Sequence, residues 1–120
     1  MFINLKHQKL RVYASSKKLI CECYRFASTL PIEEKYSMVS QIRRAALSVH
    51  LNITEGASRF SRLERKRFYE IARGSLIEID AAFDIAEELG YFKFYVLDEL
   101  HQAMNDSFSL LTGLINSQMD

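Results

Sequence analysis

Helix-breaking residues are scarce in this chain, whose 120 residues include one proline and four glycines. Folds built from strands need frequent tight turns, and tight turns depend on proline and glycine. So few breakers favour long helices joined by short connections. The apolar share of 48% and the charged share of 26% are typical of a globular protein. They exclude intrinsic disorder, collagen and a disulfide-rich miniprotein.

The spacing of apolar residues divides the chain into four helical segments. In each segment these residues recur at steps of three and four, which is the period of one face of a helix. The predicted helices span about residues 6–27, 32–55, 62–89 and 93–117. Four helices of this length with short loops predict an all-α fold, a single up-down-up-down antiparallel four-helix bundle over residues 1–120.

Individual residues mark the ends of these helices. Pro31 is expected in the first turn of the second helix, and Gly56 is expected to stop that helix in a left-handed conformation. Ser61 and Glu64 have the spacing of a capping box at the start of the third helix, which Gly90 closes.

Each helix is expected to bury its apolar stripe in the core. The predicted stripe of the third helix comprises Phe68, Ile71, Ala72, Ser75, Ile79, Ala82, Phe83 and Ala86. The predicted stripe of the fourth comprises Leu97, Leu100, Met104, Phe108, Leu111 and Ile115.

Charge is distributed in blocks although the net charge is only +1. Residues 43–73 carry eight Lys or Arg against three Asp or Glu, whereas residues 74–106 carry one lysine against eight acids. The basic block can attract phosphates or the acidic block of a neighbouring copy. The modest net charge and a pI near 7.8 favour protein-mediated assembly over nucleic-acid binding.

The basic block supplies six candidate residues for binding nucleic acid or a partner. These residues are Arg43, Arg59, Arg62, Arg65, Lys66 and Arg67. Arginines at the start of a helix bind phosphate through the guanidinium and free backbone amides. The alternatives are a solvated face or a contact between subunits. Phe60 and Tyr69 are the nearest aromatic residues able to stack on a base, and packing in the core or anchoring of the loop is the competing role.

A second group of polar residues lies on one face of the second helix. Gln41, Ser48, Asn52 and Glu55 are separated by steps of three, four or seven residues. The predicted network comprises Gln41, Arg44, Ser48, Asn52, Glu55, Gly56 and Arg59. We expect Glu55 to pair with Arg44 or Arg59, and Asn52 to bond a backbone group of the loop. The network either fixes the turn and the helix register or forms a site for a subunit or ligand.

Signals for catalysis or a cofactor are weak. Cys21 and Cys23 point to different sides of a helix and are expected to be reduced thiols. Asp98 and His101 have the spacing of one metal-ligand pair, but no second motif completes a di-iron site. The glycines form no phosphate-binding loop. The sequence therefore predicts a protein that is not an enzyme and binds no cofactor or metal.

Membrane insertion and export are not expected either. The longest uncharged stretch, residues 107–119, is shorter than a membrane span and contains polar residues. The N-terminal residues lack the apolar core of a signal peptide. We therefore expect a cytoplasmic protein.

Several motifs together resemble one bacterial family. They are QIRRAALSV at 41–49, NITEG at 52–56, RFS at 59–61, FYEIARGSL at 68–76 and ELGY at 88–91. Upstream, Leu30-Pro31 and Glu34-x-Tyr36 also fit. In order and spacing these segments are similar to the four helix bundle proteins, also called 23S rRNA-intervening sequence proteins. Thr54 departs from the alanine that the family usually has at this position.

The resemblance implies a bundle that assembles into a ring-like homo-oligomer of five chains. A related group, the accessory proteins of diversity-generating retroelements, binds a reverse transcriptase and nucleic acid. Two functions are therefore expected as alternatives. One is a self-assembling adaptor or scaffold, and the other is an accessory factor that binds RNA or DNA, or a nucleic-acid-processing protein, through the basic residues.

Overall fold

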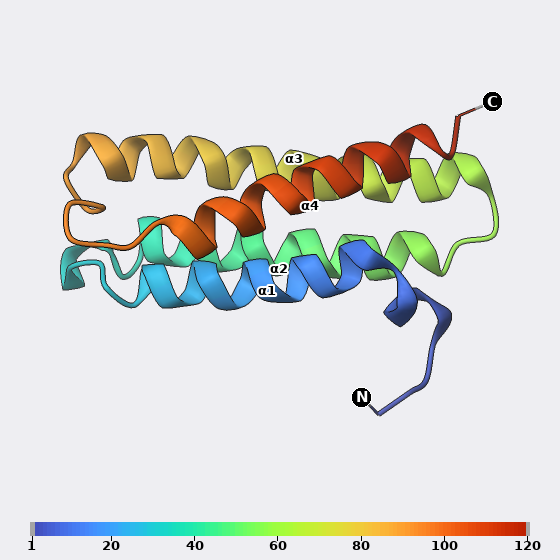
Figure 1. Ribbon diagram of the computed structural model, residues 1–120, viewed down its shortest axis with the longest axis horizontal. Coiled ribbons are helices and arrows are strands. Elements are labelled where there is room, and N and C mark those ends of the chain that lie inside the picture. The colour runs from blue at the N-terminus through green and yellow to red at the C-terminus, as the bar shows by residue number, and fades with distance from the viewer. Residues whose placement is uncertain (1, 120) are drawn as a thin grey trace.

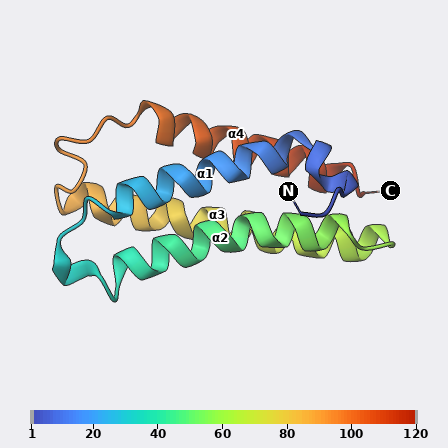
Figure 2. The same cartoon turned by 90° about the horizontal axis from the view of Figure 1, so that it is seen from below.

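In the part of the chain that the structure describes, four antiparallel α-helices form a bundle (Figure 1). They are α1 (Arg11–Ala27), α2 (Met38–Ala57), α3 (Arg62–Glu88) and α4 (Asp98–Asn116). The computed structural model describes residues 2–119, and of Lys9 the backbone alone. Each helix packs against the next, and α4 returns to α1, so that α1 and α3 lie diagonally across the bundle (Figures 1 and 2). The predicted all-α up-down fold is confirmed.

The core is built from side chains that all four helices turn inward. Phe26 from α1, Ile42 and Ile53 from α2, Leu76 from α3 and Leu111 from α4 are almost fully buried. Burying one large apolar side chain contributes about 1.5–3 kcal/mol, so this common core is the main source of the bundle's stability.

The first two helices begin later than predicted. Residues Lys6–Lys9 form a short 3-10 helix, η1, because Leu10 adopts an extended conformation and α1 starts only at Arg11. Residues Ile32–Glu34 form a second 3-10 helix, η2, and α2 starts at Met38. The predicted starts at residues 6 and 32 are therefore wrong by about one turn or more.

The fourth helix begins at Asp98 rather than at residue 93. Phe92 and Tyr95, in the connection before it, fold back onto Phe26 of α1. The rings of Phe92 and Phe26 stack with their centroids 4.2 Å apart, and Tyr95 meets Phe26 edge-on at 5.2 Å. Burial of these aromatic rings requires a folded-back chain, which a helix starting at residue 93 does not provide.

The two glycines expected to end helices behave differently. Gly90 follows α3 in a left-handed conformation, with a φ of 79°, and closes the helix as predicted. Gly56 lies inside α2, which continues to Ala57, and the prediction of a left-handed cap there is wrong. A Cβ on Gly56 would lie 2.8 Å from Cε1 of Tyr69, so glycine is needed because α3 approaches closely.

Ser61 provides its part of the capping box predicted at the start of α3. The Ser61 hydroxyl accepts a hydrogen bond of 3.1 Å from the backbone N–H of Glu64. This bond satisfies one of the free N–H groups of the first turn and sets the direction in which α3 leaves the loop.

Candidate functional site

The predicted polar network lies along the line where α2 meets α3. The hydroxyl groups of Ser48 on α2 and Ser75 on α3 share a hydrogen bond of 2.9 Å. Asn52 donates from Nδ2 to the Ser48 carbonyl oxygen at 2.9 Å and to its hydroxyl at 3.1 Å. The expected bond from Asn52 to the loop backbone is therefore wrong, since its amide is used within α2.

The ends of the network are more exposed than its centre. Glu55 forms its predicted ion pair with Arg59, whereas Arg44 lies exposed. Gln41 donates from Nε2 to Glu78 across the two helices at 3.5 Å. The bond between the Ser48 and Ser75 hydroxyl groups therefore joins α2 to α3 at the half-buried centre of the network.

Two of the six basic candidates make extensive contacts within the chain. Arg65 donates to the carbonyl oxygens of Phe60 at 2.6 Å and Arg59 at 3.1 Å, and to the side chain of Gln118 at 2.8 Å. The Arg59 guanidinium lies 4.9 Å from the centroid of Phe68, in addition to its pair with Glu55. These arginines hold the loop between α2 and α3 together.

The other four basic candidates lie in two parts of the bundle. Arg62 and Arg67 are exposed and Lys66 is half-buried, all on the first turns of α3. Arg43 lies 16 residues before Arg59, about 24 Å along the helix axis, and its guanidinium covers the ring of Tyr24 at 5.2 Å. The structure therefore gathers five of the six candidates at one end of the bundle and leaves Arg43 near the other.

The two aromatic candidates also differ. Tyr69 is buried against Gly56, where burial raises the pKa of its hydroxyl. Phe60 is completely exposed in the loop beside the basic residues. Of these two candidates, Phe60 is therefore the one that presents its ring to solvent.

An exposed apolar surface on α3 was not predicted from the sequence. The residues that form this α3 outer face point away from the core and are exposed; they are Leu63, Arg67, Ile71, Gly74, Ile77, Ala81 and Ile85. Leu63 is 78% exposed, and Ile77 and Ile85 are each 54% exposed. Ile71, predicted to be in the core, is instead 43% exposed. These residues share one side of the helix, opposite the buried side, and they are recognised only once the buried side of α3 is known.

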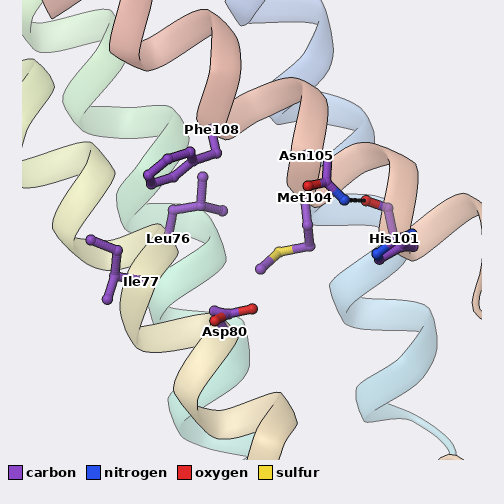
Figure 3. Close-up of a pocket in the computed structure, with 7 residues that line it drawn as sticks. All are labelled: Leu76, Ile77, Asp80, His101, Met104, Asn105 and Phe108. Carbon is purple, nitrogen blue, oxygen red and sulfur yellow. Dashed lines mark hydrogen bonds between the residues drawn. The ribbon is translucent and has the colours of Figure 1, made fainter.

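A groove of about 370 Å³ borders this face between α3 and α4 (Figure 3). Leu76, Ile77 and Asp80 of α3 line it opposite His101, Met104, Asn105 and Phe108 of α4. Phe108, predicted to be in the core, is 43% exposed at this groove. Asn105 is held by a hydrogen bond of 2.8 Å to the carbonyl oxygen of His101. The groove continues the apolar surface of α3 toward α4.

The two cysteines differ in exposure. Cys21 is exposed, whereas burial and the charge of Glu22 raise the pKa of Cys23 to about 12. Within residues 2–119, no three His, Cys, Asp or Glu side chains come together in an arrangement that could hold a metal ion. Across the same range, each helix lacks the combination of length and hydropathy required to cross a membrane.

The chain matches a known protein family. The family model described as 23S rRNA-intervening sequence protein matches residues 8–113, which include nearly all of the four-helix bundle. A search of curated proteins finds no match.

Proposed function

Because the chain belongs to the 23S rRNA-intervening sequence protein family, we propose that it is a non-enzymatic cytoplasmic scaffold that assembles with copies of itself. The observation that carries this proposal is the α3 outer face. Leu63, Ile77 and Ile85 are large aliphatic residues that one helix presents to solvent along its length. Contiguous apolar surface of this kind is typical of an interface between proteins.

The adjoining groove supports the same proposal. Phe108 and Met104 of α4 extend the apolar surface beyond α3, so that a neighbouring chain has a hollow as well as a ridge to pack against. The five-membered ring that the family resemblance implies remains part of the proposal. The assembled scaffold would recruit another protein through the surfaces that remain exposed.

Light scattering on a sizing column tests the assembly. We expect the unmodified chain to elute as an oligomer and the variant Ile77→Glu with Ile85→Glu to elute as a monomer of unchanged helix content. Ile32→Glu is the matched control, because Ile32 is 76% exposed but lies in η2, away from α3. A monomeric unmodified chain would refute the proposal, and so would an equal loss of assembly in the control.

Nucleic-acid binding is the second candidate function, and the basic end of α3 favours it. Arg62, Lys66 and Arg67 lie on its first turns, next to the fully exposed ring of Phe60. Basic side chains contact phosphates and an exposed aromatic ring stacks on an unpaired base. Single-stranded RNA or DNA fits this combination.

Protein purified without nuclease tests this candidate. Absorbance at 260 nm that nuclease removes would support it, and Arg62→Glu with Lys66→Glu should abolish binding while leaving helix content unchanged. The control is Lys93→Glu, since Lys93 is exposed in the connection before α4, at the opposite end of the bundle. Binding that survives the double reversal with an unchanged dependence on salt would exclude the basic residues as the site.

A further inference from the structure

Large apolar side chains are exposed at the end of the bundle that lies opposite the start of α3. The connection between α1 and α2 and the connection between α3 and α4 both lie at this end (Figure 1). The Tyr91 hydroxyl joins the two connections by donating to Glu34 at 2.7 Å. Tyr36 is 87% exposed and Phe94 is 93% exposed, so their rings contribute almost nothing to the core. The exposed large apolar residues of this loop end are Ile32, Tyr36, Leu89, Phe94, Val96 and Leu97.

The loop end also carries an excess of acidic residues. Residues 30–37 and 84–98 hold six Asp or Glu against two lysines. These lysines, Lys35 and Lys93, each lie over the ring of the aromatic residue that follows, 5.3 and 5.5 Å from its centroid. Arg25, in the last turn of α1, is paired with a glutamate of its own helix. The surface around the exposed rings is therefore negatively charged overall.

Two of these acids occupy an unfavourable position in α3. Glu87 and Glu88 lie in its last turn, which contains no basic residue. The free carbonyl groups at the end of a helix carry partial negative charge, so acidic side chains there lower the stability of the helix. Both glutamates are exposed, and within residues 2–119 neither side chain forms a hydrogen bond or ion pair. They are available to the basic groups of another molecule.

A partner has to match both properties of the loop end. Several large apolar side chains exposed together are typical of a contact with a protein or a membrane. Negative charge repels nucleic acids and anionic lipids, whereas it attracts a basic protein. A basic amphipathic helix carries large apolar side chains and lysine or arginine within one short segment. Such a helix therefore complements the loop end in both respects.

We propose that the loop end is a docking surface for a basic amphipathic helix of another protein. Tyr36 and Phe94 pack against the apolar side of that helix, and Glu87 and Glu88 meet the lysine or arginine residues beside it. Basic groups at this position also offset the unfavourable charges at the end of α3, which strengthens the contact.

This inference rests on the proposed scaffold function, because it names the surface that recruits a second protein and the chemistry of that protein. The loop end shares no residue with the α3 outer face or with the groove between α3 and α4. Docking and self-assembly can therefore be measured separately.

A synthetic peptide tests the apolar part of the contact. The probe is a labelled helix of about 14 residues, about 21 Å long, with leucine on one side and lysine on the other. We expect fluorescence anisotropy to show saturable binding, and no binding when glutamate replaces lysine in the peptide. Tyr36→Ser with Phe94→Ser should raise the dissociation constant about tenfold. Phe2→Ser with Phe60→Ser is the matched control, since both rings are fully exposed, one before η1 and one between α2 and α3. Equal affinities of the two variants would overturn the proposal.

Charge reversal tests the acidic part of the contact. Glu88→Lys should raise the dissociation constant of the lysine peptide about fivefold. Helix content should not fall, because lysine suits the end of a helix. The control is Glu70→Lys, which changes the net charge equally at an exposed position of the same helix, about 27 Å away along its axis. Equal weakening in both variants would mean that the peptide responds only to net charge, which contradicts a site at the loop end.

Vesicles and the oligomeric state complete the test. The chain should not sediment with vesicles of phosphatidylcholine and phosphatidylglycerol. Sedimentation that Tyr36→Ser with Phe94→Ser abolishes would assign the loop end to a membrane and overturn the proposal. A chain that assembles but does not bind the lysine peptide would refute docking and leave self-assembly intact. A monomeric chain that binds the peptide through the loop end would refute the scaffold and retain the docking surface.

Discussion

Gly56 of α2 lies against the ring of Tyr69 of α3, so closely that a Cβ at position 56 would be 2.8 Å from Cε1 of the ring. It would also lie 2.9 Å from Cβ of Phe68. Both neighbours lie near the start of α3, and Tyr69 is buried. Glycine at this position therefore allows the two helices to approach where the chain reverses.

Replacing this glycine tests the close approach. Gly56→Ala should lower the free energy of unfolding by about 1–3 kcal/mol, because the added methyl group overpacks the contact with Tyr69. Gly113→Ala is the control, since Gly113 is also helical but a Cβ there meets no atom within 4 Å. The control should raise stability by up to about 1 kcal/mol through helix propensity. Chemical denaturation of the two variants measures both changes, and stabilisation by Gly56→Ala would contradict the role assigned to it.

The sequence predicted the four helices because their apolar stripes repeat over many turns. It misplaced the start of α4 because the residues before it, taken locally, are compatible with a helix. Their conformation is set by stacking of Phe92 and Tyr95 on Phe26, which is 66 residues away from Phe92 along the chain. Contacts between distant segments override the local preference for helix. Such contacts cannot be recognised from a local sequence pattern.

The α3 outer face was missed for a different reason. Apolar residues occur on several sides of α3, and Ile77 and Ile79 are only two residues apart, although one is exposed and the other is fully buried. Periodicity identifies an amphipathic helix but does not settle which of two broad apolar sides faces the core. The α2 residues of the polar network could be predicted from their spacing. The contact of Ser48 with Ser75 of α3 could not, because it follows from how the two helices pack.

Arg65 is expected to stabilise the loop between α2 and α3. Its guanidinium donates to Phe60 and Arg59 carbonyl oxygens and to Gln118, so it joins the loop to the end of the chain. Arg65→Met should lower the free energy of unfolding by about 1–3 kcal/mol, because the bonds of a charged donor are lost. Arg67→Met is the control, as Arg67 is exposed on the same helix. Equal effects of the two substitutions on denaturation midpoints would refute the structural role.

The two cysteines should differ sharply in reactivity. Thiolate is the reactive form, and burial beside Glu22 raises the pKa of Cys23 to about 12, whereas Cys21 is exposed. Labelling of the native chain with a thiol reagent should therefore modify Cys21 alone, and Cys21→Ser should abolish native labelling. Unfolding in denaturant should release one reactive thiol in that variant. Rapid labelling of Cys21→Ser under native conditions would show that Cys23 is accessible.

His50 connects α2 to the N-terminal part of α1. Its Nδ1 lies 2.7 Å from the Ser16 hydroxyl, and its ring centroid lies 4.6 Å from that of the buried Tyr13. Tyr13 in turn contacts the buried His7 of η1 at 5.2 Å. Burial, reinforced by the nearby charges of Lys17 and His7, lowers the pKa of His50 below 6.5. The folded chain therefore favours the neutral imidazole.

This depressed pKa makes stability depend on pH. As the pH falls below about 6.5, His50 of the unfolded chain binds a proton before that of the folded chain. The free energy of unfolding should therefore decrease from pH 7 toward pH 5 and recover when the pH is raised. His50→Gln should flatten this part of the profile, whereas His101→Gln, at an exposed position on α4, should leave it unchanged. Urea denaturation at a series of pH values measures the slope, and an unaltered slope in His50→Gln would assign the pH dependence to other groups.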